Sequence, residues 1–320
     1  MKLLIAYDGS ECADAAVENT PAAGLPDRAE AIVLSVGEVW DLPAHAESVA
    51  AGSEKFVFPI TRLIDEHLRE IEEKNRKLAE MAAARVKEIF PDWRVSAEAV
   101  CGKPAIEIIK RADQFSPDLL IVGSHGRSAL GRAILGSVSH KILHEARSSV
   151  RISRRCTWED ETSATNRVLI AVDGSANAET TVKAVAARQW PPATEFRLIA
   201  VNDPFTRPPA GYVGWNLEKD EPIDTPEASA WIEKVIEAPR RILSAANLEA
   251  SHNIRWGDAA AMILREAEDW RAHQIFLGAR GLGRVKRFLL GSVSSAVAAQ
   301  ARCTVEVVRQ PTELSTNIEK

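Results

Sequence analysis

An internal repeat constrains this chain more than any other feature. The segment LIAYDGS at residues 4–10 recurs as LIAVDGS at residues 169–175, 165 positions later. Two further segments, GSHG (123–126) and GSVS (136–139), recur as GARG (278–281) and GSVS (291–294), 155 positions later. Self-similarity over such spans indicates a tandem duplication. The 320 residues also exceed an average domain of roughly 100–200 residues, so we expect two domains.

The two halves differ in length. The offset between them falls from 165 to 155, so the first half carries about ten additional residues, the difference 165 − 155, between Val39 and Ala82. We expect a longer helix or a lid there. Within this region Leu63, Leu68 and Ile71 begin an apolar stripe among charges, which predicts a helix over residues 63–90.

Short apolar runs alternate with longer amphipathic stretches in both halves. The predicted strands cover residues 2–7, 31–36, 94–100, 119–122 and 150–153, and then 167–172, 196–201, 250–255, 274–277 and 304–308. This alternation is typical of an α/β, doubly wound fold, in which helices cover both faces of a parallel sheet. We expect domains at residues 1–153 and 166–309, a polar linker at 154–165 and a polar tail at 310–320.

Composition excludes several classes of protein. The net charge is 40 − 45, or −5, and the pI is about 5.9, which argues against non-specific nucleic-acid binding. The N-terminal apolar run stops at Asp8, and no later stretch approaches the roughly 18 uncharged apolar residues of a membrane span. The four cysteines, Cys12, Cys101, Cys156 and Cys303, lack metal-site spacing. We therefore expect a cytoplasmic protein without a membrane partner or a metal centre of its own.

A glycine loop follows a buried apolar strand in each half. Both loops obey the spacing Gly-x2-Gly-x9-Gly-Ser, through Gly123, Gly126, Gly136 and Ser137, and through Gly278, Gly281, Gly291 and Ser292. A glycine at a strand end lets a ligand approach the backbone, and the last glycine opens a helix whose free amides attract an anion. Both loops carry cations that suit phosphate, although solvated arginines and simple turns remain alternatives. These cations are Arg127, Arg132, Arg284, Lys286 and Arg287.

An aspartate ends the first strand of each half. Asp8 and Asp173 stand at the carboxyl edge of the predicted sheet, where open parallel sheets place ligand contacts. A carboxylate there suits an adenine amino group, a ribose hydroxyl or a magnesium ion. An Asp-Gly-Ser turn or a helix cap is the competing interpretation.

These motifs together resemble those of the universal stress protein family, here with two such domains in tandem. The resemblance implies five-stranded sheets of order 3-2-1-4-5 and, in the ATP-binding branch, ATP with Mg²⁺ between the aspartate and the glycine loop. Arg127 would add a phosphate contact. By position, the nucleotide contacts of the first half would be Asp8, Val36, Gly123, Gly126, Gly136, Ser137 and Ser139. Those of the second half would be Asp173, Val201, Gly278, Gly281, Gly291, Ser292 and Ser294.

The resemblance also implies pairing through the last strand. We expect an internal pseudo-dimer in which residues 150–153 run antiparallel to residues 304–308, and a homodimer is a further option. An unpaired edge strand exposes backbone groups that invite such pairing. Arg151 must then point to solvent or pair with an acid such as Glu306.

Other chemistries fit less well. The chain lacks the Ser-Gly-Gly-x-Asp-Ser loop of ATP-pyrophosphatases, a Walker P-loop and a Gly-x-Ser-x-Gly elbow. His140 and His144 have a spacing that can chelate a metal, but solvated surface histidines are the preferred interpretation. We therefore expect an ATP-binding regulatory or stress-response protein with no identified catalytic residue and at most slow hydrolysis. A scaffold that binds no nucleotide, and an ATP-dependent enzyme, are the alternatives.

Overall fold

The computed structural model describes residues 1–39, 54–126, 135–156, 165–203, 215–216, 221–222, 225–281 and 290–310. Of the segments set apart by sequence, the linker is described at residues 154–156 and 165, and the tail at residue 310. The loop residues Arg127 and Arg132 lie outside the described residues, as do Arg284, Lys286 and Arg287.

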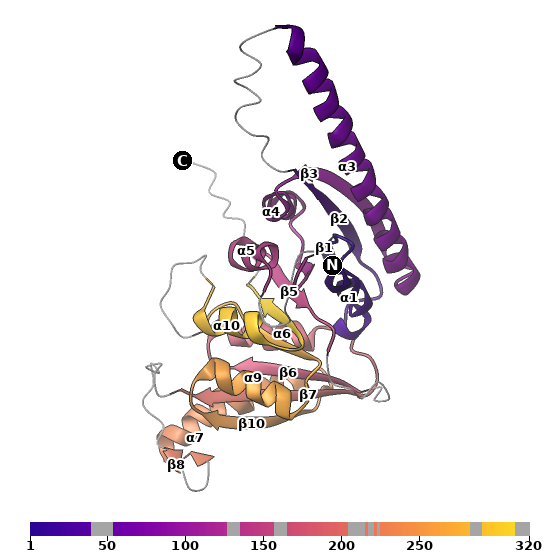
Figure 1. The fold of residues 1–320 in the computed structure, drawn as a ribbon. Helices are drawn as coiled ribbons and strands as arrows, with labels where there is room; N and C mark the ends of the chain where they lie inside the picture. The colour runs from indigo at the N-terminus through magenta and orange to yellow at the C-terminus, as the bar shows by residue number, and fades with distance from the viewer. Residues whose placement is uncertain are drawn as a thin grey trace, which may run out of the picture.

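In the described ranges, ten long strands and the helices between them build the two halves (Figure 1). The strands of the first half are β1 (Lys2–Ala6), β2 (Glu30–Glu38), β3 (Arg94–Gly102), β4 (Leu119–Gly123) and β5 (Ser149–Ser153). Its helices are α1 (Glu11–Glu18), the 3₁₀ turn η1 (Pro21–Ala23), α3 (Glu54–Ile89), α4 (Pro104–Phe115) and α5 (Ser137–Glu145). Every strand predicted for this half is present, and its ends lie within two residues of the prediction.

The second half repeats this order. Its strands are β6 (Asn166–Val172), β7 (Thr194–Asn202), β10 (Ala250–Trp256), β11 (Gln274–Gly278) and β12 (Thr304–Val308), and a small separate sheet joins β8 (Trp215–Asn216) and β9 (Glu221–Pro222). Its helices are α6 (Ala176–Ala186), α7 (Pro226–Ile232), the π-helical turn η2 (Glu233–Glu237), α8 (Ala238–Ser244), α9 (Ala259–Asp269) and α10 (Ser292–Gln300). The sequence did not predict β8, β9 or the π-helical turn.

All ten long strands form one continuous sheet. Its order is β10-β7-β6-β11-β12-β5-β4-β1-β2-β3, so each half has the predicted order 3-2-1-4-5 and is parallel within itself. The halves meet where β5 and β12 pair antiparallel, with Val150 opposite Val307 and Ile152 opposite Val305. The expected internal pairing is therefore present, and it removes two sheet edges that would otherwise stay open.

Three hydrophobic clusters hold the layers together. One lies between the first-half sheet and helices α1 and α3, and includes Leu3, Ile5 and Val86; a second lies under α6 and α8. The third runs from one half into the other and joins residues such as Ile142 of α5 to Val297 of α10. The two halves therefore share a core, because the same apolar face continues across the β5–β12 junction.

The additional residues of the first half lengthen a helix. Helix α3 has 36 residues and begins at Glu54, nine positions before the predicted start at Leu63. Figure 1 shows its N-terminal part extending past the strands. In the second half the shorter segments α7, η2 and α8 occupy the corresponding place in the chain. The prediction of a longer helix is confirmed for the described part, and residues 40–53 lie outside it.

Each last strand is followed by an arginine that reaches into the opposite half. Arg154 Nη2 donates to the carbonyl of Ala298 in α10 over 2.6 Å, and Arg309 Nη2 donates to the carbonyl of Leu143 in α5 over 2.5 Å. Carbonyls of a last helical turn lack partners within the helix, so a guanidinium stabilises them. Burial lowers the pKa of both arginines to about 10. These two contacts fix α5 and α10 against the junction.

Candidate functional site

Asp8 and Asp173 follow the carboxyl ends of the two central strands, β1 and β6. Asp8 Oδ1 accepts the amide of Ser10 over 3.0 Å, and Asp173 Oδ1 accepts the amide of Ser175 over 2.9 Å. The glycine between the aspartate and the serine has a φ of 76° in the first half and 74° in the second, a conformation that glycine tolerates best. Each aspartate therefore lies in a tight turn of the same kind, and one of its carboxylate oxygens stabilises that turn.

The serine of this turn caps the helix that follows. Ser10 Oγ accepts the amide of Ala13 over 3.2 Å at the start of α1, and Ser175 Oγ accepts the amide of Ala178 over 3.2 Å at the start of α6. The turn interpretation of Asp-Gly-Ser is thus realised, and the serine alone supplies the helix cap. The second oxygen of each aspartate takes no part in either task.

That second oxygen faces the middle glycine of the loop. A Cβ built on Gly126 would lie 3.1 Å from Asp8 Oδ2, and one built on Gly281 would lie 2.5 Å from Asp173 Oδ2. The structure therefore brings together the two motifs that the sequence placed far apart. The missing side chain leaves a cradle beside the carboxylate, which a Cβ would fill.

The first glycine of each loop packs against the helix that follows the first strand of its half. A Cβ on Gly123 would lie 2.8 Å from the carbonyl carbon and oxygen of Cys12, and one on Gly278 would lie 3.0 Å from the carbonyl carbon of Asn177. These are backbone atoms of the first turns of α1 and α6. Gly123 and Gly278 therefore make room for a helix, and the close approach of a ligand to their backbone stays a prediction.

The last glycine of each loop starts a helix that no side chain caps. Gly136 and Gly291 are the N-cap residues of α5 and α10, with extended backbone and no side-chain hydrogen bond to the first turn. Ser137 and Ser292 follow and are exposed. The first amides of both helices and the hydroxyls beside them are therefore placed to meet an anion.

Ser139 and Ser294 are buried and already hydrogen-bonded. Ser139 Oγ donates to the carbonyl of Gly123 over 2.6 Å, and Ser294 Oγ donates to the carbonyl of Gly278 over 2.7 Å. Their hydroxyl protons tie α5 and α10 to the ends of β4 and β11. The nucleotide contact that the resemblance implies for these serines would therefore use the hydroxyl oxygen as an acceptor.

Val36 and Val201 lie near the carboxyl ends of β2 and β7, and both are half-buried. Strand β2 runs beside β1 with Ala6 opposite Leu34, so Val36 stands two residues further along the edge that Asp8 follows. Val201 has the matching place in the second half, where Val172 pairs with Ala200. Each valine therefore lies at the same carboxyl edge of the sheet as the aspartate of its half. Arg127, the remaining predicted contact, falls outside the described part of the chain.

The two sites differ at one position that sequence reasoning missed. His125 stands in the first loop where Arg280 stands in the second. His125 Nδ1 lies 3.0 Å from Ser124 Oγ, and burial together with the charge of Arg154 lowers the pKa of the imidazole. The first loop therefore carries a neutral ring at neutral pH and the second a cation. An alignment of GSHG with GARG reveals this difference between the two loops.

His140 and His144 form a pair on α5 with ring centroids 4.4 Å apart. His140 is exposed, but His144 is half-buried and its Nε2 lies 3.4 Å from Ser295 Oγ of α10. Burial, His140 and Arg309 lower the pKa of His144. The expectation of two solvated histidines was therefore wrong for His144, because the junction between the halves covers it.

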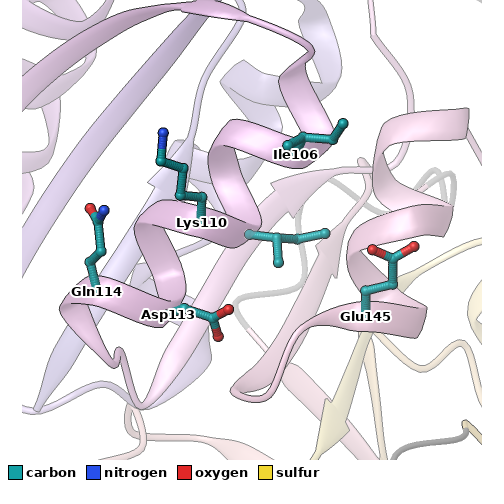
Figure 2. A pocket seen from close by; sticks show the side chains of 6 residues that line it. Ile106, Lys110, Asp113, Gln114 and Glu145 are labelled. Atoms are coloured by element: carbon teal, nitrogen blue, oxygen red, sulfur yellow. The ribbon is translucent and has the colours of Figure 1, made fainter.

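A shallow hollow of about 430 Å³ lies on α4 beside the end of α5 (Figure 2). It is lined by Ile106, Ile109, Lys110, Asp113, Gln114 and Glu145. Glu145 is the last residue of α5, whereas the first loop meets that helix at its opposite end. The hollow therefore lies at the end of α5 away from Gly136.

Known proteins resemble this chain in both sequence and fold. The sequence profile described as "Universal stress protein family" matches residues 1–154 and again residues 164–309. This chain belongs to the universal stress protein family. Universal stress protein YxiE of Bacillus subtilis is 32% identical over 155 residues, which cover 48% of this chain and 98% of that protein.

Two further relatives extend across both halves of this universal stress protein. A universal stress protein of Mycolicibacterium smegmatis is 29% identical over 206 residues, 61% of this chain and 62% of that protein. The crystal structure of a universal stress protein from Archaeoglobus fulgidus has a TM-score of 0.65 and 23% identity, and the match covers 96% of this chain and 98% of that one. That likeness supports the tandem fold. Within the described ranges, no helix is long and apolar enough to cross a membrane.

Proposed function

We propose that each half of this universal stress protein binds one molecule of ATP, and that the protein has a regulatory or stress-response role. The observation that carries the proposal is the duplicated site, in which an aspartate oxygen faces a glycine and an uncapped helix begins nearby. A Cβ at Gly126 would lie 3.1 Å from Asp8 Oδ2, and a Cβ at Gly281 would lie 2.5 Å from Asp173 Oδ2. Two copies of one arrangement are hard to attribute to turn chemistry alone.

The residues present suit the parts of the nucleotide. The first amides of α5 and α10, with Ser137 and Ser292, would hold phosphate oxygens, because helix N-termini attract anions. The second carboxylate oxygens, Asp8 Oδ2 and Asp173 Oδ2, would accept from a ribose hydroxyl or bind Mg²⁺. When bound, Mg²⁺ neutralises phosphate charge.

We propose that any hydrolysis is slow and confined to the first half. Hydrolysis of ATP needs a side chain that orients the attacking water. The lowered pKa keeps His125 a neutral ring, which offers one acceptor nitrogen that could orient a water, whereas the guanidinium of Arg280 has no acceptor nitrogen. The first half would then hydrolyse ATP slowly, and the second half would bind the phosphates more tightly through Arg280.

Paired aspartate variants test the proposal. Bound ATP stabilises the folded chain by RT ln(1 + [L]/Kd), about 2.7 kcal/mol at a ligand concentration of 100 Kd. Asp8→Ala and Asp173→Ala should each remove part of the ATP-induced rise in melting temperature, and the double variant should remove all of it. Asp65→Ala, on the exposed face of α3, is the control and should respond as the parent does.

Three results would count against the proposal. An absent thermal shift in the parent, at ATP concentrations up to the millimolar range, would favour the scaffold alternative. An unchanged shift in the double variant would mean that nucleotide binds elsewhere. Turnover that persists in His125→Ala would contradict the role given to the first loop.

A further inference from the structure

The two halves meet on a local pseudo-twofold axis between β5 and β12. Arg151 pairs with Glu306, and these residues hold equivalent places in the repeat, because 306 − 151 is the same 155 that relates the glycine loops. The flanking pairs obey the same rule. Val150, the equivalent of Val305, lies opposite Val307. A residue on this axis faces its own counterpart, so the axis position decides which strands can pair.

Both axis side chains are fully buried. Arg151 is 1% exposed and Glu306 is 0% exposed. Arg151 Nη1 lies 3.2 Å from Glu306 Oε2, and Arg151 Nη2 donates to Gln274 Oε1 over 2.9 Å. Burial lowers the pKa of Arg151 to about 10, with Glu306 opposing that change. A buried charge is tolerated when it is paired and hydrogen-bonded, as this one is.

A second arginine makes the junction unequal. Arg188, 10% exposed at its side chain, ion-pairs with Glu306 through its terminal nitrogens Nη1 and Nη2, and Nη1 also donates to the carbonyl of Ala23 over 2.8 Å. Ala23 is the counterpart of Arg188 in the first half, since 188 − 165 is 23. The second half thus supplies the acid and an additional cation, whereas the first half supplies Arg151 and a small residue.

We propose that the Arg151–Glu306 pair selects the partner of each last strand. The β5 edge accepts a strand with a carboxylate at the axis, and the β12 edge accepts one with a guanidinium there. The fitting partner of β5 is therefore β12 of the same chain. Two β5 strands from two copies would bury Arg151 against Arg151, and two β12 strands would bury Glu306 against Glu306. Arg151 would then face a like charge without a counterion, and each Glu306 would keep Arg188 but lose the guanidinium at the axis, so both arrangements are less favourable than the β5–β12 pairing.

Charge reversal in the full chain tests this selection. The background is Arg188→Gln, which leaves the axis pair as the single ion pair at that place. In that background, Arg151→Glu alone and Glu306→Arg alone each create a like-charge axis. Each should melt at least 10 °C below the Arg188→Gln control, and sedimentation should detect less of the compact monomer that we expect for that control. The combined variant R151E/E306R should recover the monomer and most of the lost melting temperature.

Mixing the two single reversals gives the decisive result. Arg151→Glu and Glu306→Arg chains, refolded together or co-expressed with different tags, can match every axis by pairing with each other. They should form a one-to-one complex of twice the monomer mass, which neither chain forms alone. The proposal is overturned if both single reversals remain monomers as stable as the control. It is equally overturned if the mixed or co-expressed chains yield no complex between the two tags.

Discussion

The first glycine of each loop allows a prediction that separates folding from binding. A Cβ added by Gly123→Ala would lie 2.8 Å from the carbonyl carbon and oxygen of Cys12 and 3.0 Å from the amide nitrogen of Ala13. These are backbone atoms, so α1 must move by about 0.6 Å to restore an ordinary contact of 3.4 Å. Gly123 does not need a positive φ, and the effect is therefore steric. Overpacking of this kind costs about 1–3 kcal/mol.

The assay is thermal unfolding followed by circular dichroism. At about 2–4 °C per kcal/mol for a unit of this size, Gly123→Ala should lower the melting temperature by about 2–12 °C. Gly126→Ala is the matched control, because its Cβ would meet a side-chain atom, Asp8 Oδ2, at 3.1 Å. The control should keep its melting temperature and lose ATP binding in the first half. The reasoning fails if Gly123→Ala is as stable as the parent.

Two further predictions concern charge. Glu266 is 1% exposed and binds Arg197 and Arg255, so Glu266→Ala should cost about 3 kcal/mol in denaturant unfolding, against about 1 kcal/mol for the more exposed Glu98→Ala. The pKa of Glu266 is lowered despite its burial, because both arginines favour the carboxylate. Its contribution should be full above pH 4.5 and fall as the pH drops through that lowered pKa. Burial and Asp14 raise the pKa of Tyr7 to about 12. Absorbance titration should show one tyrosine ionising near that pH and moving lower in Asp14→Ala, and stability should decline between pH 10 and 12.

The fold could be predicted from the sequence because its determinants are local and repeated. Apolar runs of strand length, such as those that became β1 and β4, have few other options once helices must cover both faces. The repeat then doubled each signal. The pairing of β5 with β12 also followed, because Val305 and Val307 had to be covered and Arg151 needed an acid, which Glu306 supplies.

Features that depend on contacts between distant segments were not predictable. The spacing of the loop glycines does not reveal that Gly123 makes room for Cys12 whereas Gly126 faces Asp8, because both statements require the packing of α1 against the loop. The second cation on Glu306 comes from Arg188, which lies outside both strands of the junction. Composition and periodicity do not predict such contacts between distant segments.

The central claim is that each half holds its own nucleotide. Isothermal titration of the unmodified chain with MgATP tests it most directly, because one experiment counts the sites without altering either. The account predicts two molecules of ATP per chain, with the tighter site in the second half, beside Arg280. A stoichiometry of one would mean that one site is degenerate, and an absence of binding heat over the whole range would contradict the account.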